Sequence, residues 1–257
     1  MAEFVVSIAS YPKRAHLLPA VFEALNQQTV VPKKWILVLS VEEWPQKKLP
    51  YYLEKLIKRG LEIIWVKNNT YAVKKLVPVI EKYPELGVIT FDDELIYGKQ
   101  VIEKLVVCSQ KNKGAIIGHI GKELILQNGE LKMFNRTKKG ADLKTPSEQV
   151  YFLGGSGTFY PSRSLNSKVC DIEAIHSIVP GRGSDIWFWA AAVANGTQQI
   201  CLGTKHDLNL FFSIPSTNNT LPKDTPSRTI MEQRFQMTID FFAIRGKLLK
   251  TLPNIKM

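Results

Sequence analysis

The chain has 257 residues, of which 45% are hydrophobic, so it can bury a sizeable core and is not a disordered protein. Lys and Arg number 34 against 23 Asp and Glu, and this net charge of +11 favours an anionic partner: nucleic acid, an acidic membrane surface or a phosphorylated substrate. Three widely spaced cysteines without a C-x-x-C pair argue against a disulfide framework and a structural zinc site, so a reducing cytosol is expected.

The first 120 residues alternate between apolar runs and helical patterns. The run at 4–10 follows no basic segment and is too short for a signal peptide or a membrane span, so it is expected to be a strand. Expected strands are 4–10, 35–40, 61–66, 87–91 and 114–120, and expected helices are 16–26, 49–60, 72–85 and 99–110. This α/β alternation predicts one mostly parallel, twisted sheet with helices on both faces.

The pattern changes after residue 120. Residues 123–134 form two alternating runs around Asn128-Gly129, which predicts a hairpin. The remaining expectations, in chain order, are a basic loop at 135–149, a glycine-broken strand at 151–161, a helix with an N-cap at Ser184 over 184–196, an irregular segment at 203–228 and an amphipathic helix at 229–250.

Three consecutive carboxylates interrupt this basic chain in "VITFDDELIYG". Asp92, Asp93 and Glu94 fall at the carboxyl end of the expected strand 87–91, where ligands bind in doubly wound sheets. Adjacent carboxylates repel one another, and an all-oxygen site favours Mg²⁺ or Mn²⁺. The alternative is a solvated loop in which one Asp caps the helix that starts near Lys99.

Five motifs in order resemble the family 2-like glycosyltransferases with a GT-A fold. They are "SIASYPKR", "PKKWILVLS", "KKLVPVIEKYPE" followed by "ITFDDELIYG", then "GGSGTFYP" and "GSDIWFWAAAVANG", spanning about residues 4–196. The resemblance implies a GT-A domain over 1–228, with a nucleotide-binding half at about 1–120 and an acceptor half at about 121–228. Residues 229–257 would be a C-terminal helical extension.

The resemblance also implies roles for individual residues. The residues expected to contact the donor are Ser10, Tyr11, Pro12, Arg14, Lys75, Asp92 and Asp93. Metal contacts are expected from Asp92, Glu94 and His206, and acceptor contacts from Gly155, Ser156 and Trp187. Asp185 is expected to act as the catalytic base. Glu94 stands where the family has a metal-binding Asp. His206 also suits a purely structural role, as a lone histidine.

Elementary chemistry supports the same division of roles. Loss of a nucleotide diphosphate creates negative charge that a divalent cation or basic groups stabilise. A positioned carboxylate such as Asp185 can take the proton of an acceptor hydroxyl. The competing interpretation is that Asp185 merely stabilises a helix N-terminus. Trp187 and Trp189 cannot share one helix face, so at least one belongs to the core.

The expected function is transfer of a sugar from a UDP-linked donor to a hydroxyl of a glycan or lipid-linked glycan, with inversion and with Mn²⁺ or Mg²⁺. A nucleotidylyltransferase is disfavoured because "SIASYPKRAHLL" contains no glycine. A non-catalytic basic protein that binds an anionic polymer such as nucleic acid is the alternative, although no nucleic-acid module is present. A cytoplasmic location is expected. The helix at 229–250 either lies on an anionic membrane or packs on the sheet.

Overall fold

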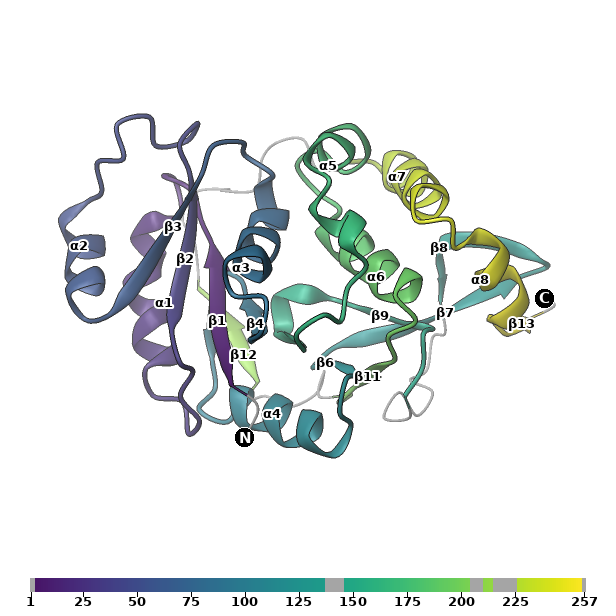
Figure 1. The fold of residues 1–257 in the computed structure, drawn as a ribbon, viewed down its shortest axis with the longest axis horizontal. Coiled ribbons are helices and arrows are strands. Elements are labelled where there is room, and N and C mark those ends of the chain that lie inside the picture. The colour runs from purple at the N-terminus through teal and green to yellow at the C-terminus, as the bar shows by residue number, and fades with distance from the viewer. Residues whose placement is uncertain (1–2, 137–145, 204–209, 215–225, 256–257) are drawn as a thin grey trace.

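The computed structural model describes residues 3–136, 146–203, 210–214 and 226–255. A twisted sheet lies between layers of helices, with a smaller sheet beside it towards the C-terminus (Figure 1). The main sheet has seven strands in the order β11-β6-β10-β4-β1-β2-β3. Their bounds are β1 Phe4–Ala9, β2 Trp35–Ser40, β3 Leu61–Val66, β4 Gly87–Phe91, β6 Ile116–Gly118, β10 Thr158–Tyr160 and β11 Gln199–Cys201.

The sheet is mostly parallel, as the sequence predicts. β1 pairs in parallel with β2 and β4, β2 with β3, and β11 with β6, whereas β10 runs antiparallel to β4 and β6. The central strands are nearly continuous apolar runs because both faces of the sheet are covered. The carboxyl ends of β1 and β4 therefore lie side by side, and the loops that follow them meet.

Helices cover both faces of the sheet. One face carries Val6 and Ile8 and packs against α1 (Leu18–Leu25), α2 (Tyr51–Lys58) and α4 (Val101–Lys111). The other face carries Val5 and packs against α3 (Val77–Lys82) and α6 (Ser184–Ala194), and α5 (Ile172–Ile178) belongs to the same apolar cluster. Alternate strand residues point to opposite faces, so each strand contributes to both core layers.

The smaller sheet forms around the predicted hairpin. β7 (Gly121–Gln127) and β8 (Glu130–Arg136) are joined at Asn128 and Gly129, which both have positive φ. β9 (Val150–Phe152) and β13 (Asn254–Ile255) pair with β7. α7 (Arg228–Phe241) packs through Phe235 on Trp189 of α6, with ring centroids 5.8 Å apart. The apolar side of the C-terminal segment thus packs on the fold.

Two predicted helices are each broken in the structure. The segment 72–85 forms the 3₁₀ helix η2 (Tyr71–Lys75) and then α3, because Pro78 has no N–H to continue the first turn and disfavours helical geometry before it. The segment 229–250 forms α7 and α8 (Arg245–Thr251), which are separated at Ala243 with φ of 55°.

Other departures from the sequence prediction are small. Ser184 is the first residue of α6 and not its N-cap, which is Gly183. Short elements escaped prediction because they lack a long pattern: β5 (Leu95–Tyr97), β11, β12 (Phe211–Ser213), α5 and the 3₁₀ helices η1 (Ala15–Leu17), η3 (Gly154–Ser156) and η4 (Ser167–Cys170). Within the described residues, no helix has the length and apolarity needed to cross a membrane.

Candidate active site

The acidic triplet lies at the carboxyl end of β4, where the sequence predicts it. Asp92 and Glu94 are half-buried, and Asp93 is only 4% exposed. The chain then turns directly into β5, so the three carboxylates occupy a tight connection between two strands. The neighbouring loop after β1 supplies the groups that contact them.

Asp93 is held by that loop. Ser10 Oγ donates a hydrogen bond to Asp93 Oδ2 at 2.6 Å, and Arg14 Nη1 donates to Oδ1 at 3.0 Å. Burial raises the pKa of Asp93, although the Ser10 hydroxyl and the Arg14 guanidinium oppose the shift. Both oxygens of Asp93 are therefore engaged by the chain itself.

Arg14 also pairs with Glu94. Its Nη2 lies 2.8 Å from Glu94 Oε2, so one guanidinium bridges two carboxylates of the triplet. Burial alone would lower the pKa of Arg14, but the charges of Asp93 and Glu94 outweigh it and raise that pKa. Burial raises the pKa of Glu94, against the charge of Arg14. The Arg14 side chain also lies over the Tyr11 ring, whereas Pro12 is exposed.

Lys75 reaches Asp92 from η2 on the face of the sheet that α6 covers. Its Nζ lies 2.8 Å from Asp92 Oδ1, and the residue is 4% exposed. Burial alone would lower the pKa of Lys75, but the charges of Asp92 and then Asp185 outweigh it and raise that pKa. Lys75 is thus a buried cation behind the triplet and not a surface group.

Asp185 approaches the same place from the first turn of α6. A Cβ added at Gly154 would stand 2.6 Å from Asp185 Oδ1 and 3.9 Å from Lys75 Nζ. A Cβ added at Gly155 would collide with Asp92 Oδ2. Gly154 and Gly155 therefore form a short stretch of backbone without side chains, the glycine strip. Asp185 lies against Gly154, and Asp92 lies against Gly155. Carboxylates that are 93 positions apart in the chain converge here because only glycine leaves room for them.

Tyr97 joins the triplet to this glycine strip, and the sequence analysis missed it. Its hydroxyl accepts a hydrogen bond from the Asp92 backbone N–H at 2.8 Å and donates one to the Gly155 carbonyl at 2.7 Å. Burial, followed by the Asp92 charge, raises its pKa well above the usual value. The only sequence signal was the alternation of "LIY", which predicts a strand but not this role.

Arg182 is a second residue that the sequence analysis missed. It lies in the loop before α6, and its charge acts on Glu94 from that side of the site. Its carbonyl accepts a hydrogen bond from Arg234 Nη1 at 2.6 Å, which links the loop to α7. Arg182 and Arg14 thus bring positive charge to the triplet from different elements.

Two residues predicted to contact the acceptor have other surroundings. Trp187 is fully buried, donates from Nε1 to the Val169 carbonyl at 2.9 Å and stacks on Phe241. The prediction that its ring faces a sugar is therefore wrong, because α6 is apolar on nearly all sides and turns Trp187 into the core. Ser156 is also buried, and its hydroxyl donates to the Leu153 carbonyl at 2.8 Å.

The residues present suit a metal ion that is shared with a phosphate ligand. Asp92 and Glu94 each keep one carboxylate oxygen outside their ion pairs. Mg²⁺ and Mn²⁺ are commonly held by one or two carboxylates together with substrate phosphates. No cluster of three or more protein ligands occurs in the described part of the chain, and His206 lies outside it. A closed, all-protein metal cage is thus not formed by the described residues.

The charges of the cluster lead to the same conclusion. Four carboxylates stand against three cations, with Asp92, Asp93, Glu94 and Asp185 on one side and Arg14, Lys75 and Arg182 on the other. The cluster therefore carries a net charge of about −1 when all of these groups are ionised. A diphosphate would add further negative charge, which a divalent cation offsets.

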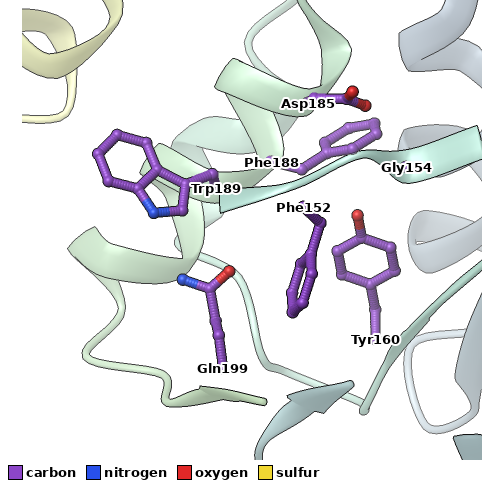
Figure 2. A pocket seen from close by; sticks show the side chains of 7 residues that line it. All are labelled: Phe152, Gly154, Tyr160, Asp185, Phe188, Trp189 and Gln199. Carbon is purple, nitrogen blue, oxygen red and sulfur yellow. The ribbon is translucent and has the colours of Figure 1, made fainter. Parts of the chain in front are cut away.

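A small cavity lies behind Asp185 (Figure 2). Its walls are mainly aromatic, and it is lined by Phe152, Gly154, Tyr160, Asp185, Phe188, Trp189 and Gln199. Its volume of about 10 Å³ is enough for one water molecule and far too small for a sugar. This cavity therefore has no room for a sugar beside Asp185.

Comparison with known proteins shows similarity in fold. No protein-family model matches the chain, and no curated protein matches it in sequence. The crystal structure of S. aureus TarS 1–349 matches with a TM-score of 0.51 at 11% identity, covering 97% of this chain and 75% of that one. The same TarS fragment in complex with UDP-GlcNAc gives a TM-score of 0.51 at 11% identity, covering 97% and 76%.

A third match, the crystal structure of 4-diphosphocytidyl-2C-methyl-D-erythritol synthase, has a TM-score of 0.48 at 7% identity, covering 84% of this chain and 95% of that one. At such identities the likeness concerns the fold alone. The chain has the GT-A-like fold of nucleotide-sugar transferases, as one mixed α/β unit around a mostly parallel sheet. This confirms the fold that the sequence motifs predict.

Proposed function

We propose that the chain is a glycosyltransferase that moves a sugar from a UDP-sugar to a hydroxyl of a glycan or lipid-linked glycan. The observation that carries this proposal is the convergence of Asp92 and Asp185 on adjacent residues of the Gly154–Gly155 strip. A donor-side carboxylate and a candidate base then face one space. The GT-A-like fold supports the proposal, as does the UDP-GlcNAc complex of the structural neighbour TarS.

The donor would bind at the carboxyl ends of β1 and β4. The loop that contains Ser10, Tyr11, Pro12 and Arg14 lies against the triplet and would contact the nucleotide and its diphosphate. A divalent cation held by Asp92 and Glu94 would supply the positive charge that stabilises the leaving diphosphate. Asp93 would act indirectly, because its carboxylate holds the side chains of Ser10 and Arg14 in place. Lys75 would act through Asp92 and not by touching the donor, since it is buried.

Asp185 would act as the general base. It takes the proton of the acceptor hydroxyl while the acceptor oxygen forms a bond to the anomeric carbon. The bond from that carbon to the β-phosphate oxygen breaks, and its electron pair leaves with UDP. Attack from the side opposite the leaving group inverts the anomeric configuration. A base placed in this way is worth roughly 10²- to 10⁴-fold in rate.

Titration calorimetry of UDP into the whole chain, with and without Mn²⁺, tests the proposal. We expect binding with Mn²⁺, much weaker binding without it, and loss of binding in Asp92→Asn. Asp240→Asn is a matched control, because Asp240 pairs with Arg245 on the distant C-terminal helices. Absence of binding to any nucleotide, together with steeply salt-dependent binding of oligonucleotides, would favour a basic polymer-binding protein instead.

The acceptor and the location are further parts of this proposal. A lipid-linked acceptor would place the protein at the cytoplasmic face of an anionic membrane. Sedimentation with vesicles that contain anionic lipid, compared with neutral vesicles, tests this part separately. Equal amounts of protein sedimenting with both kinds of vesicle would rule out the proposed contact with an anionic membrane. The chemistry proposed at Asp185 would not be affected by that result.

A further inference from the structure

The hydroxyl of Tyr97 lies between the two halves of the site. The residue is 3% exposed, and its ring packs on Phe91 with centroids 4.2 Å apart. The oxygen uses both of its hydrogen-bonding capacities on backbone, accepting from Asp92 N–H and donating to the Gly155 carbonyl. Through these two hydrogen bonds, the Tyr97 side chain joins the segment of the triplet to the glycine strip.

The position of this bridge matters because the sheet ladder ends before it. β10 pairs with β4 at Thr158 and Thr90, and the chain on either side, Gly154–Gly157 and the triplet, lies beyond the ladder. Gly155 must nevertheless stay in close contact with Asp92, since even one added carbon at Gly155 would collide with Asp92 Oδ2. Beyond the ladder, the Tyr97 hydroxyl links the two segments by hydrogen bonds at 2.8 and 2.7 Å.

Tyr97 is itself anchored by the C-terminal part of the fold. β5 pairs with β12 in the antiparallel register Tyr97 to Phe211 and Leu95 to Ser213. Backbone hydrogen bonds continue on both sides, from Ile214 N–H to the Glu94 carbonyl and from Gly98 N–H to the Leu210 carbonyl, each at 3.0 Å. The segment from Glu94 to Gly98, which contains β5, is thus held along its length.

We propose that Tyr97 is a positioning residue whose hydroxyl sets the distance between the donor carboxylates and Asp185, by fixing Asp92 against the Gly154–Gly155 strip. This inference rests on the proposed function. The position of Asp92 depends on Tyr97, because its backbone N–H donates to the tyrosine hydroxyl. Asp185 belongs to α6, so its position does not depend on this hydroxyl. Without the hydroxyl, a bound donor would move with Asp92 away from the base. A displacement of about 1 Å costs on the order of 10²-fold in rate.

Tyr97→Phe is the direct test, because it removes the hydroxyl and keeps the ring. We expect kcat for UDP release from a UDP-sugar to fall at least about tenfold, while the Kd for UDP with Mn²⁺ changes less than about threefold. Tyr83→Phe is the matched control. This variant also loses a hydrogen bond from a tyrosine hydroxyl, the one that Tyr83 donates to Glu62 at 2.6 Å. Because this bond lies far from the triplet, kcat should be unchanged.

Gly155→Ala gives a second approach that keeps the Tyr97 hydroxyl. Its Cβ would push on Asp92 Oδ2, so kcat should again fall at least about tenfold. Gly246→Ala is its control, since an added Cβ there meets nothing within 4 Å. A kcat that stays normal in a folded Tyr97→Phe protein would overturn the proposal, as would a loss of UDP affinity equal to the loss of kcat.

A readout without turnover separates this inference from the proposed function. In Tyr97→Phe, amide hydrogen exchange should accelerate at Asp92 and in the Gly154–Gly157 segment, because the bridging oxygen is gone. A wild-type protein that releases no UDP would defeat the proposed function, whereas unchanged exchange in the variant would defeat the positioning role. If Tyr97→Phe does not fold, Gly155→Ala decides the matter through kcat.

Discussion

Lys75 and Asp92 form a salt bridge of 2.8 Å in which the lysine is 4% exposed and the carboxylate side chain is 34% exposed. The cation is therefore on the protein side of the pair, and one edge of the carboxylate remains open to a ligand. Lys75 Nζ and Asp185 Oδ1 both lie within 4 Å of the point where a Gly154 Cβ would stand. One buried charge thus stabilises the carboxylates on both sides of the glycine strip.

Replacing Lys75 with Met should weaken both the fold and the site. Breaking a buried ion pair costs roughly 3–5 kcal/mol, and the partial exposure of Asp92 reduces this to about 1–3 kcal/mol. UDP affinity should fall as well, because the remaining carboxylates repel a diphosphate more strongly. Urea unfolding and UDP titration measure the two effects. Because the pKa of Lys75 is raised, its contribution is present at neutral pH and is lost only as pH rises above the usual lysine range.

Gly154→Ala should lower turnover sharply, because the new Cβ would stand 2.6 Å from Asp185 Oδ1 and displace that carboxylate. We expect a loss of at least about tenfold in kcat for UDP release, with little effect on UDP binding. Gly246→Ala serves again as the neutral control. Equal kcat values in these two variants would show that Asp185 does not act from the position described.

Removal of divalent cations should greatly weaken UDP binding and leave the fold intact. The three carboxylates of the triplet are already paired with Arg14 and Lys75, so the fold does not depend on a bound metal. Thermal unfolding in EDTA without nucleotide should match that in Mn²⁺, whereas UDP should raise Tm only with Mn²⁺. Stabilisation by UDP in EDTA would mean that the cations of the chain suffice for the diphosphate.

Glu62 provides a test of electrostatics away from the site. Burial alone would raise its pKa, but hydrogen bonds from Lys82, Tyr83 and Lys34 outweigh this and lower it to about 2. A lowered carboxylate pKa gives stability that is present above the unfolded value and lost as pH falls through the folded value. Glu62→Gln should therefore cost about 1 kcal/mol at pH 7, since Lys34 and Lys82 are 42% and 50% exposed and solvent screens their charges, and nothing well below pH 2. Urea unfolding of both proteins at a series of pH values from 7 downwards checks it, and a difference that does not shrink as the pH falls towards 2 would contradict it.

The sequence predicts the fold well because its signals are local. Runs such as 35–40 and 61–66 become strands with those bounds, and the triplet follows β4 as expected. Separate motifs mark the segments of Asp92 and Asp185, and the structure brings these two carboxylates to adjacent glycines. Long patterns with clear turn residues are sufficient for these predictions.

The parts that were missed depend on tertiary contacts. Lysine is normally exposed, so nothing local to Lys75 indicates that it is buried against Asp92. The apolar composition of α6 predicts burial of the helix but does not say which side Trp187 faces. Tyr97 gains its role only when β5 packs beside the glycine strip, a contact between residues 58 positions apart. His206 lies outside the described residues, so its role as a metal ligand stays a prediction.

The division of roles between the triplet and Asp185 is tested most directly by Asp185→Asn. The measurement is kcat for UDP release from a UDP-sugar, made together with the Kd of UDP in Mn²⁺. We predict a fall in kcat of roughly 10²- to 10⁴-fold with the Kd almost unchanged, because the amide keeps the shape of the side chain but cannot take the acceptor proton. Turnover close to that of the wild type would contradict the assignment of Asp185 as the base.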